Sequence, residues 1–126
     1  MSKALLLNEV DRLIDLLHKG KPIELGAIPW ASPVLAFGDP IGSRVATLGL
    51  NPSNLEFVDQ YGRELNAPNR RFESLASLRV SNWGQTASRD VRSVWRACEN
   101  YFYGNPYKQW FNRLEKLIVG TGTSYC

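Results

Sequence analysis

The sequence predicts an α/β domain that contains more helix than strand, and three stretches carry this prediction. An apolar run at 45–50 is followed at once by chain breakers, which is typical of a strand buried on both faces of a parallel sheet. Apolar residues recur at helical spacing in two other stretches, 3–19 and 88–103. With 126 residues, of which 44% are hydrophobic, the chain is long enough for one domain, 1–126, with its own core.

The first expected helix spans residues 3–19. Its apolar positions recur every three or four residues, Ser2 is a plausible N-cap, and Gly20 ends it. The only histidine, His18, falls in the last turn, where a cation favours the helix dipole, and this role is preferred to a catalytic one.

A connection rich in proline and glycine follows at 20–43, and long connections are often functional. Pro29, Trp30 and residues 34–37 could line a pocket or form a short edge strand. A loop packed by its own aromatic side chains is the favoured interpretation.

The predicted strand ends in a carboxamide that proline holds in place. Pro52 fixes its own φ and keeps Asn51 extended, so the strand continues through Asn51 and then turns. In open α/β sheets, ligands bind at the carboxyl ends of strands. Two interpretations stay open: a binding site at Asn51, or a strand that ends in an Asx-type turn.

Residues 55–66 show little periodicity and are expected to form a loop. Asp59 and Glu64 are the carboxylates nearest to Asn51. Asn69 is then expected to cap a short helix with an apolar side made by Phe72, Leu75 and Leu78.

The stretch 88–103 gives the clearest amphipathic helix. Its apolar half consists of Val91, Val94, Trp95, Cys98, Tyr101 and Phe102, and the far side carries Arg89, Arg92 and Arg96. Residues 70–96 contain six arginines and two carboxylates, a net charge of +4, which exceeds the +3 of the whole chain. A basic field of this kind indicates either a phosphate-bearing partner or a solvated face, and both interpretations remain.

A last helix is expected after Asn105 and Pro106, ending at Gly120. Its predicted buried face is Trp110, Leu114, Leu117 and Ile118.

Composition argues against several classes of protein. The sequence has no run of eighteen apolar residues and no signal-peptide pattern, so a cytoplasmic protein without membrane association is expected. The two cysteines, Cys98 and Cys126, have no metal-ligand spacing, and a disulfide is not expected in the cytosol. No cofactor or metal is predicted.

Two segments resemble the uracil-DNA glycosylase superfamily. Gly49-Leu50-Asn51-Pro52-Ser53 resembles its first active-site motif, and Asn69-Arg70-Arg71-Phe72-Glu73-Ser74-Leu75 is similar to a segment of the mismatch-specific branch. The resemblance implies a parallel sheet flanked by helices, a DNA partner, and hydrolysis of the bond between base and deoxyribose. Asn51 would position the water, Phe72 would stack on the flipped base, and the backbone of residues 49–53 (Gly49, Leu50, Pro52 and Ser53) would bind its edge. The phosphate contacts would come from Arg70, Arg71, Arg89, Arg92 and Arg96.

The family's second active-site motif has no counterpart in this sequence, and only one strong strand is predicted. The expected fold is therefore a partial, helix-rich version of the three-layer glycosylase fold that resembles its N-terminal portion. A second copy or a complementing chain would then cover the exposed edge. The alternative function is a non-catalytic module that binds nucleic acid or protein.

Overall fold

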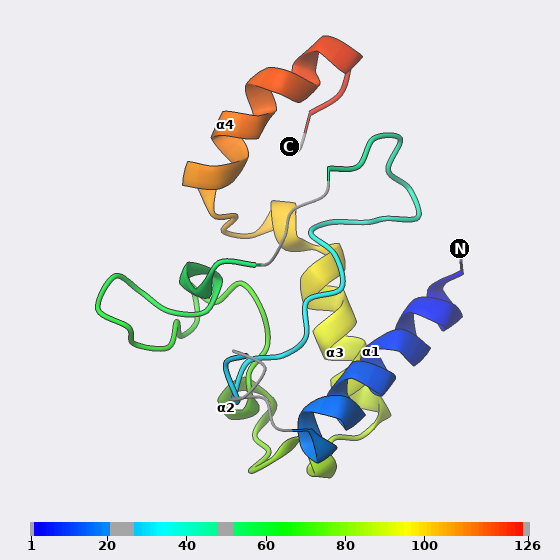
Figure 1. The fold of residues 1–126 in the computed structure, drawn as a ribbon, viewed down its shortest axis with the longest axis vertical. Coiled ribbons are helices and arrows are strands. Elements are labelled where there is room, and N and C mark those ends of the chain that lie inside the picture. Colours follow the sequence, from blue (N-terminus) through cyan, green and yellow to red (C-terminus); the bar gives the residue numbers. More distant parts are fainter. Residues whose placement is uncertain (1, 21–26, 48–51, 125–126) are drawn as a thin grey trace.

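The computed structural model describes residues 2–20, 27–47 and 52–124. These residues are 50% helical and form no strand. The helices are α1 (Lys3–Lys19), α2 (Leu75–Leu78), α3 (Ser88–Glu99) and α4 (Lys108–Ile118), with single 3-10 turns η1 (Asn54–Glu56), η2 (Trp83–Gln85), η3 (Tyr101–Tyr103) and η4 (Val119–Thr121). Figure 1 shows α1 lying across α3, with α4 extending from the opposite end of α3.

The prediction of an α/β fold with a parallel sheet is wrong. Residues 45–47, the described part of the expected strand, belong to no strand or helix and are exposed, and Val45 keeps 40% of its surface. Residues 48–50 lie outside the described residues. A β-tolerant run becomes a strand only when neighbouring strands pair with it, because strand preference depends mainly on packing context. Pairing among the described residues is limited to two isolated bridges, Ala31 with Ser74 and Val58 with Glu64.

Helix α1 confirms the predicted helix at residues 3–19. The Ser2 hydroxyl accepts a hydrogen bond from the Leu5 N–H at 3.3 Å, and the Gly20 N–H donates to the Leu16 carbonyl at 2.6 Å. Its buried face consists of Leu6, Val10 and Ile14, and this face packs on α3 and η2. A long amphipathic stripe and two local caps therefore set the bounds of this helix, and packing of its apolar face on α3 and η2 stabilises it.

The irregular segment 27–38 lies against the region of α2 and α3. Its backbone bonds to residues around α2 and α3: Ser32 N–H to the Glu73 carbonyl at 3.0 Å, and Gly38 N–H to the Cys98 carbonyl at 2.8 Å. Gly38 has a φ of +93°, and a Cβ there would lie 3.0 Å from the Phe102 ring. Only glycine combines this backbone conformation with so close an approach.

The core lies between α1, α3 and the irregular segments. Predicted core residues on α3 are buried, namely Val91, Val94, Trp95 and Cys98. Beyond the end of α3, an aromatic cluster fills the interior with ring centroids 4.8–5.5 Å apart: Phe37, Phe72, Tyr101, Phe102 and Phe111. Apolar and aromatic burial of this kind is the main favourable term for folding.

Two expectations about the short and last helices are wrong. Ser74 caps α2 in place of Asn69, because the Ser74 hydroxyl accepts from the Ser77 N–H at 3.1 Å. In α4 the predicted burial of Ile118 is confirmed, but Trp110 and Leu117 remain 52% and 74% exposed, and Phe111 is buried instead. Figure 1 shows α4 extending away from α1 and α3, and its main contacts with another element are those with η4, the turn that follows it.

Two tryptophans offer a matched test of this core. Trp95 is 1% exposed and Trp110 is 52% exposed. Trp95→Ala should lower the free energy of unfolding by about 3–5 kcal/mol, because it removes a buried aromatic side chain and leaves a cavity. Trp110→Ala should cost less than about 1 kcal/mol. Urea denaturation followed by circular dichroism measures both, and equal losses would contradict the described packing.

Candidate functional site

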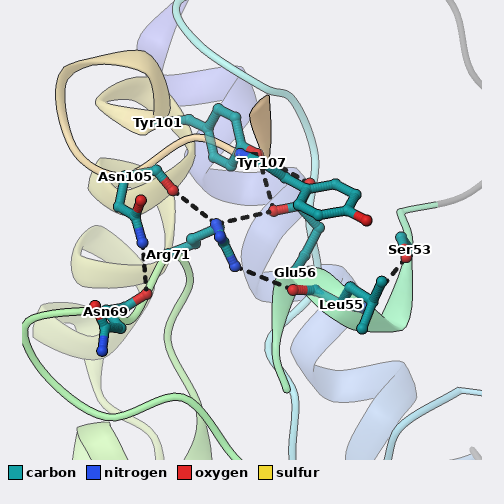
Figure 2. A network of polar contacts seen from close by, with 8 residues as sticks. All are labelled: Ser53, Leu55, Glu56, Asn69, Arg71, Tyr101, Asn105 and Tyr107. Atoms are coloured by element: carbon teal, nitrogen blue, oxygen red, sulfur yellow. Dashed lines mark hydrogen bonds and ion pairs between the residues drawn. The ribbon is translucent and has the colours of Figure 1, made fainter. Parts of the chain in front are cut away.

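The side chain of Arg71 joins the segment 69–75 to Leu55 and Glu56, which follow the segment 49–53, and to Asn105. Its Nε donates to the Asn105 carbonyl at 2.6 Å, and its Nη1 donates to the Leu55 carbonyl at 3.0 Å. The same Nε lies 3.8 Å from Glu56 Oε2 (Figure 2). Arg71 therefore links the segment around residue 71 to the first residues after Ser53, and its side chain is only 13% exposed.

Glu56 and Tyr101 form the buried half of this network. The Tyr101 hydroxyl lies 2.9 Å from both carboxylate oxygens of Glu56, to which it donates, and it accepts the Tyr107 N–H at 2.7 Å. Burial raises the pKa of the Glu56 carboxyl, and the opposing effects of the Tyr101 hydrogen bond and the Arg71 charge are smaller. Burial also raises the pKa of the Tyr101 phenol. Both groups are therefore harder to ionise than in water.

The depression that Glu56 lines is closed in the part of the chain that the structure describes. The nearest depression has no volume that a water molecule could enter, and its walls include Trp30, Glu56, Glu64, Arg70 and Phe72. A general acid or base must reach the substrate directly or through one water. The geometry of Glu56 in this closed setting therefore fits a structural link between distant segments better than proton transfer.

The predicted catalytic and base-binding residues fall in three different settings. Gly49, Leu50 and Asn51 lie outside the described residues. Pro52 and Ser53 are exposed where η1 begins, and the Ser53 hydroxyl accepts from the Leu55 N–H at 3.2 Å.

Phe72, the predicted base-stacking residue, lies inside the aromatic cluster. It is 2% exposed and stacks on Tyr101 with a centroid distance of 5.2 Å and an interplanar angle of 17°. Phe37 and Phe57 contact the same ring, each at 5.5 Å. Protein side chains thus occupy the positions around Phe72 that a flipped base would need, and the stacking role stays a prediction.

The predicted arginines separate into two groups. Arg89, Arg92 and Arg96 are exposed on one side of α3, opposite the buried residues of that helix, and we call them the α3 arginine face. Arg71 is engaged in the buried network, and Arg70 is half-buried with its Nε enclosed and without a hydrogen-bond partner. The α3 arginine face is therefore the part of the predicted set that is open to a partner.

A shallow depression of about 220 Å³ lies at the α3 arginine face. Its lining residues are Glu73, Ser93, Arg96, Ala97 and Asn100. Glu73 also accepts a hydrogen bond from the Ser77 hydroxyl. The depression combines a cation, a carboxylate and polar groups around a small apolar wall.

Sequence reasoning missed the network of Glu56 and Tyr101. Glu56 stands alone between the apolar residues Leu55 and Phe57, which is an unusual place for a carboxylate in a buried run. Buried charges normally have hydrogen-bonded partners, so this interruption was a usable signal that Glu56 has one. The identity of the partner was not readable, since Tyr101 lies 45 residues away.

Comparisons of the chain with protein-family models, curated proteins and solved structures found no match. No helix among the described residues is long and apolar enough to cross a membrane. Within the same residues, no three histidine, cysteine or acidic side chains gather where they could hold a metal ion.

The raised pKa of Glu56 predicts a pH-dependent difference from Glu56→Gln. The folded state holds the Glu56 proton more tightly than the unfolded state, so this residue's titration favours folding below its ordinary pKa of 4.5. That contribution is lost as the pH rises through the raised value. Glu56→Gln should therefore gain stability relative to wild type as the pH rises above 4.5. Urea titrations across this range measure the difference, and a constant difference would contradict the assignment.

Asp59→Asn is the matched control with the opposite sign. Hydrogen bonds from the backbone of Arg63 and Tyr61 and from the Arg63 side chain hold the pKa of Asp59 below its ordinary value of 3.8. Ionised Asp59 therefore favours the folded state, and this contribution is lost as the pH falls. The stability of wild type relative to Asp59→Asn should therefore increase as the pH rises from about 2 to 4.

Proposed function

We propose that this chain is a nucleic-acid-binding module that contacts phosphates through the α3 arginine face. The observation that carries the proposal is the division of α3 into a buried apolar half and a half on which Arg89, Arg92 and Arg96 are exposed. Guanidinium groups bind phosphate oxygens through paired, charge-assisted hydrogen bonds. A folded helix holds the three side chains in one row before any partner arrives.

The spacing along α3 suits an extended polyanion. Arg89 and Arg96 are seven residues apart, which corresponds to about 10 Å at a rise of 1.5 Å per residue. Several phosphates of one strand fall within such a span, whereas a single small anion would contact only part of it. Like charges three and four residues apart also destabilise a helix by a few tenths of a kcal/mol, and bound phosphates would remove that repulsion.

Replacing the α3 arginine face should weaken binding and its salt dependence. The triple variant Arg89→Gln, Arg92→Gln, Arg96→Gln should reduce the slope of log affinity against log salt by about two to three, one for each lost phosphate contact. Fluorescence anisotropy with a labelled oligonucleotide at several salt concentrations measures this slope. Stability should change little, because the three side chains are exposed.

A second triple variant controls for net charge alone. Arg12→Gln, Arg63→Gln and Arg113→Gln also lower the formal charge from +3 to 0, and all three positions are exposed and outside α3. This variant should keep most of the salt slope. Equal losses in the two variants would show that the chain binds by overall charge and would end the proposal for α3.

Base excision is the second candidate function. The observation that favours it is the Arg71 contact, which links the segment 69–75 to Leu55 and Glu56, the residues that follow the segment 49–53. In this candidate, Asn51 positions the water that attacks the sugar, as the resemblance implies. Completion of the site would require residues outside those two segments, since the second motif of the family has no counterpart here.

Asn51→Ala tests base excision directly. If Asn51 positions the water, this change should slow uracil release from duplex DNA by about a hundredfold, the scale of one lost transition-state hydrogen bond. DNA binding should persist, because phosphate contacts supply most of the affinity. Alkaline cleavage of abasic sites reports the release, and Asn112→Ala, an exposed amide on α4, is the control. No uracil release by folded wild-type chain would exclude this candidate.

A further inference from the structure

We infer that the depression at the α3 arginine face receives one unpaired base that carries an exocyclic amino group. This inference depends on the proposed function and extends it, because it selects single-stranded nucleic acid as the partner. The depression consists of Glu73, Ser93, Arg96, Ala97 and Asn100, and it is the described hollow that lies directly beside the phosphate-contacting arginines.

The size of the depression fits a single base. Its volume of about 220 Å³ corresponds to about seven water molecules at roughly 30 Å³ each. One planar heteroaromatic ring displaces water on this scale, whereas a stacked base pair would not enter. The small side chain of Ala97 leaves an apolar wall on α3 against which a ring can lie.

Arg96 connects the depression to the proposed contacts with the nucleic-acid phosphates. Arg96 belongs both to the α3 arginine face and to the wall of the depression. A phosphate bound at Arg96 would therefore place its attached nucleotide at the opening of the depression. In a duplex that base is stacked and paired, so only a single strand can supply it without an unstacking cost.

Glu73 determines which base edge the depression favours. One carboxylate oxygen accepts the Ser77 hydroxyl, and a carboxylate has about four acceptor sites, so acceptor capacity remains. A carboxylate has no hydrogen to donate when ionised, so it favours an amino group such as cytosine N4 and disfavours the O4 of uracil. Ser93 and Asn100 supply further polar groups for the same edge.

The test compares oligonucleotides that differ only at this edge. Oligo-dC and oligo-dU of about twelve nucleotides share a backbone and nearly the same base size, and a mixed duplex of equal length is the third probe. In fluorescence anisotropy at one salt concentration, wild type should bind oligo-dC about fivefold or more tightly than oligo-dU, and the duplex most weakly. Glu73→Gln should bring the ratio of the two single strands close to one.

Two further variants separate this inference from a charge effect or a folding defect. Glu99→Gln also removes one negative charge, as Glu73→Gln does, but Glu99 lies on α3 outside the depression. This variant should keep the preference for oligo-dC. Ser93→Leu fills the depression without changing charge, and it should reduce binding of both single strands to the level of the duplex with an unchanged salt slope. Thermal denaturation confirms that each variant is folded.

The outcomes that overturn this inference differ from those that overturn the proposed function. Equal binding of oligo-dC and oligo-dU by wild type, or an equal loss of preference in Glu99→Gln and Glu73→Gln, would refute the base-binding depression while the α3 triple variant still loses its salt slope. No binding of wild type to any of the three probes would refute the proposed function first, and this inference with it.

Discussion

The described fold depends most on the Tyr101 side chain. Its hydroxyl donates a hydrogen bond to a buried carboxylate, and its ring packs in the aromatic cluster. An unpartnered buried carboxylate costs several kcal/mol, so Glu56 is compatible with the interior only while Tyr101 donates to it and Arg71 lies nearby. The ring of the same tyrosine packs on Phe37, Phe72 and Phe111. No strand aligns the described residues, and this one side chain contacts four separate segments of them, at Phe37, Glu56, Phe72 and Phe111.

The two halves of α3 have different roles: one packs in the core, and the other carries the arginines proposed to bind a partner. One half of the helix is held by core residues such as Val94 and Trp95, and η3 continues it directly into Tyr101. The other half carries the arginines and contributes little to packing. A partner that binds this half meets side chains whose backbone is already rigid, so association orders only the guanidinium ends. Changes on the exposed half can therefore alter binding without unfolding the domain.

Local patterns predicted the helices, and long-range contacts determined the rest. The stripes of α1 and α3 were visible because helical periodicity repeats over many residues, and they placed Arg89, Arg92 and Arg96 on one exposed side. The apolar run at 45–50 was misread, since a short run does not reveal whether partner strands exist. The closed network was also invisible, because Arg71 reaches the Asn105 carbonyl 34 residues away and no local pattern encodes that pairing.

The two candidate functions differ in how far the described conformation would have to change. Stacking a flipped base on Phe72 would require its ring to leave Tyr101, Phe37 and Phe57. An aromatic side chain buries about 150–250 Å², so at about 25 cal/mol per Å² this exposure costs roughly 4–6 kcal/mol before any new contact forms. Binding through the α3 arginine face requires no such opening. Nucleic-acid binding is therefore available to the described conformation, whereas base excision that uses Phe72 requires a different one.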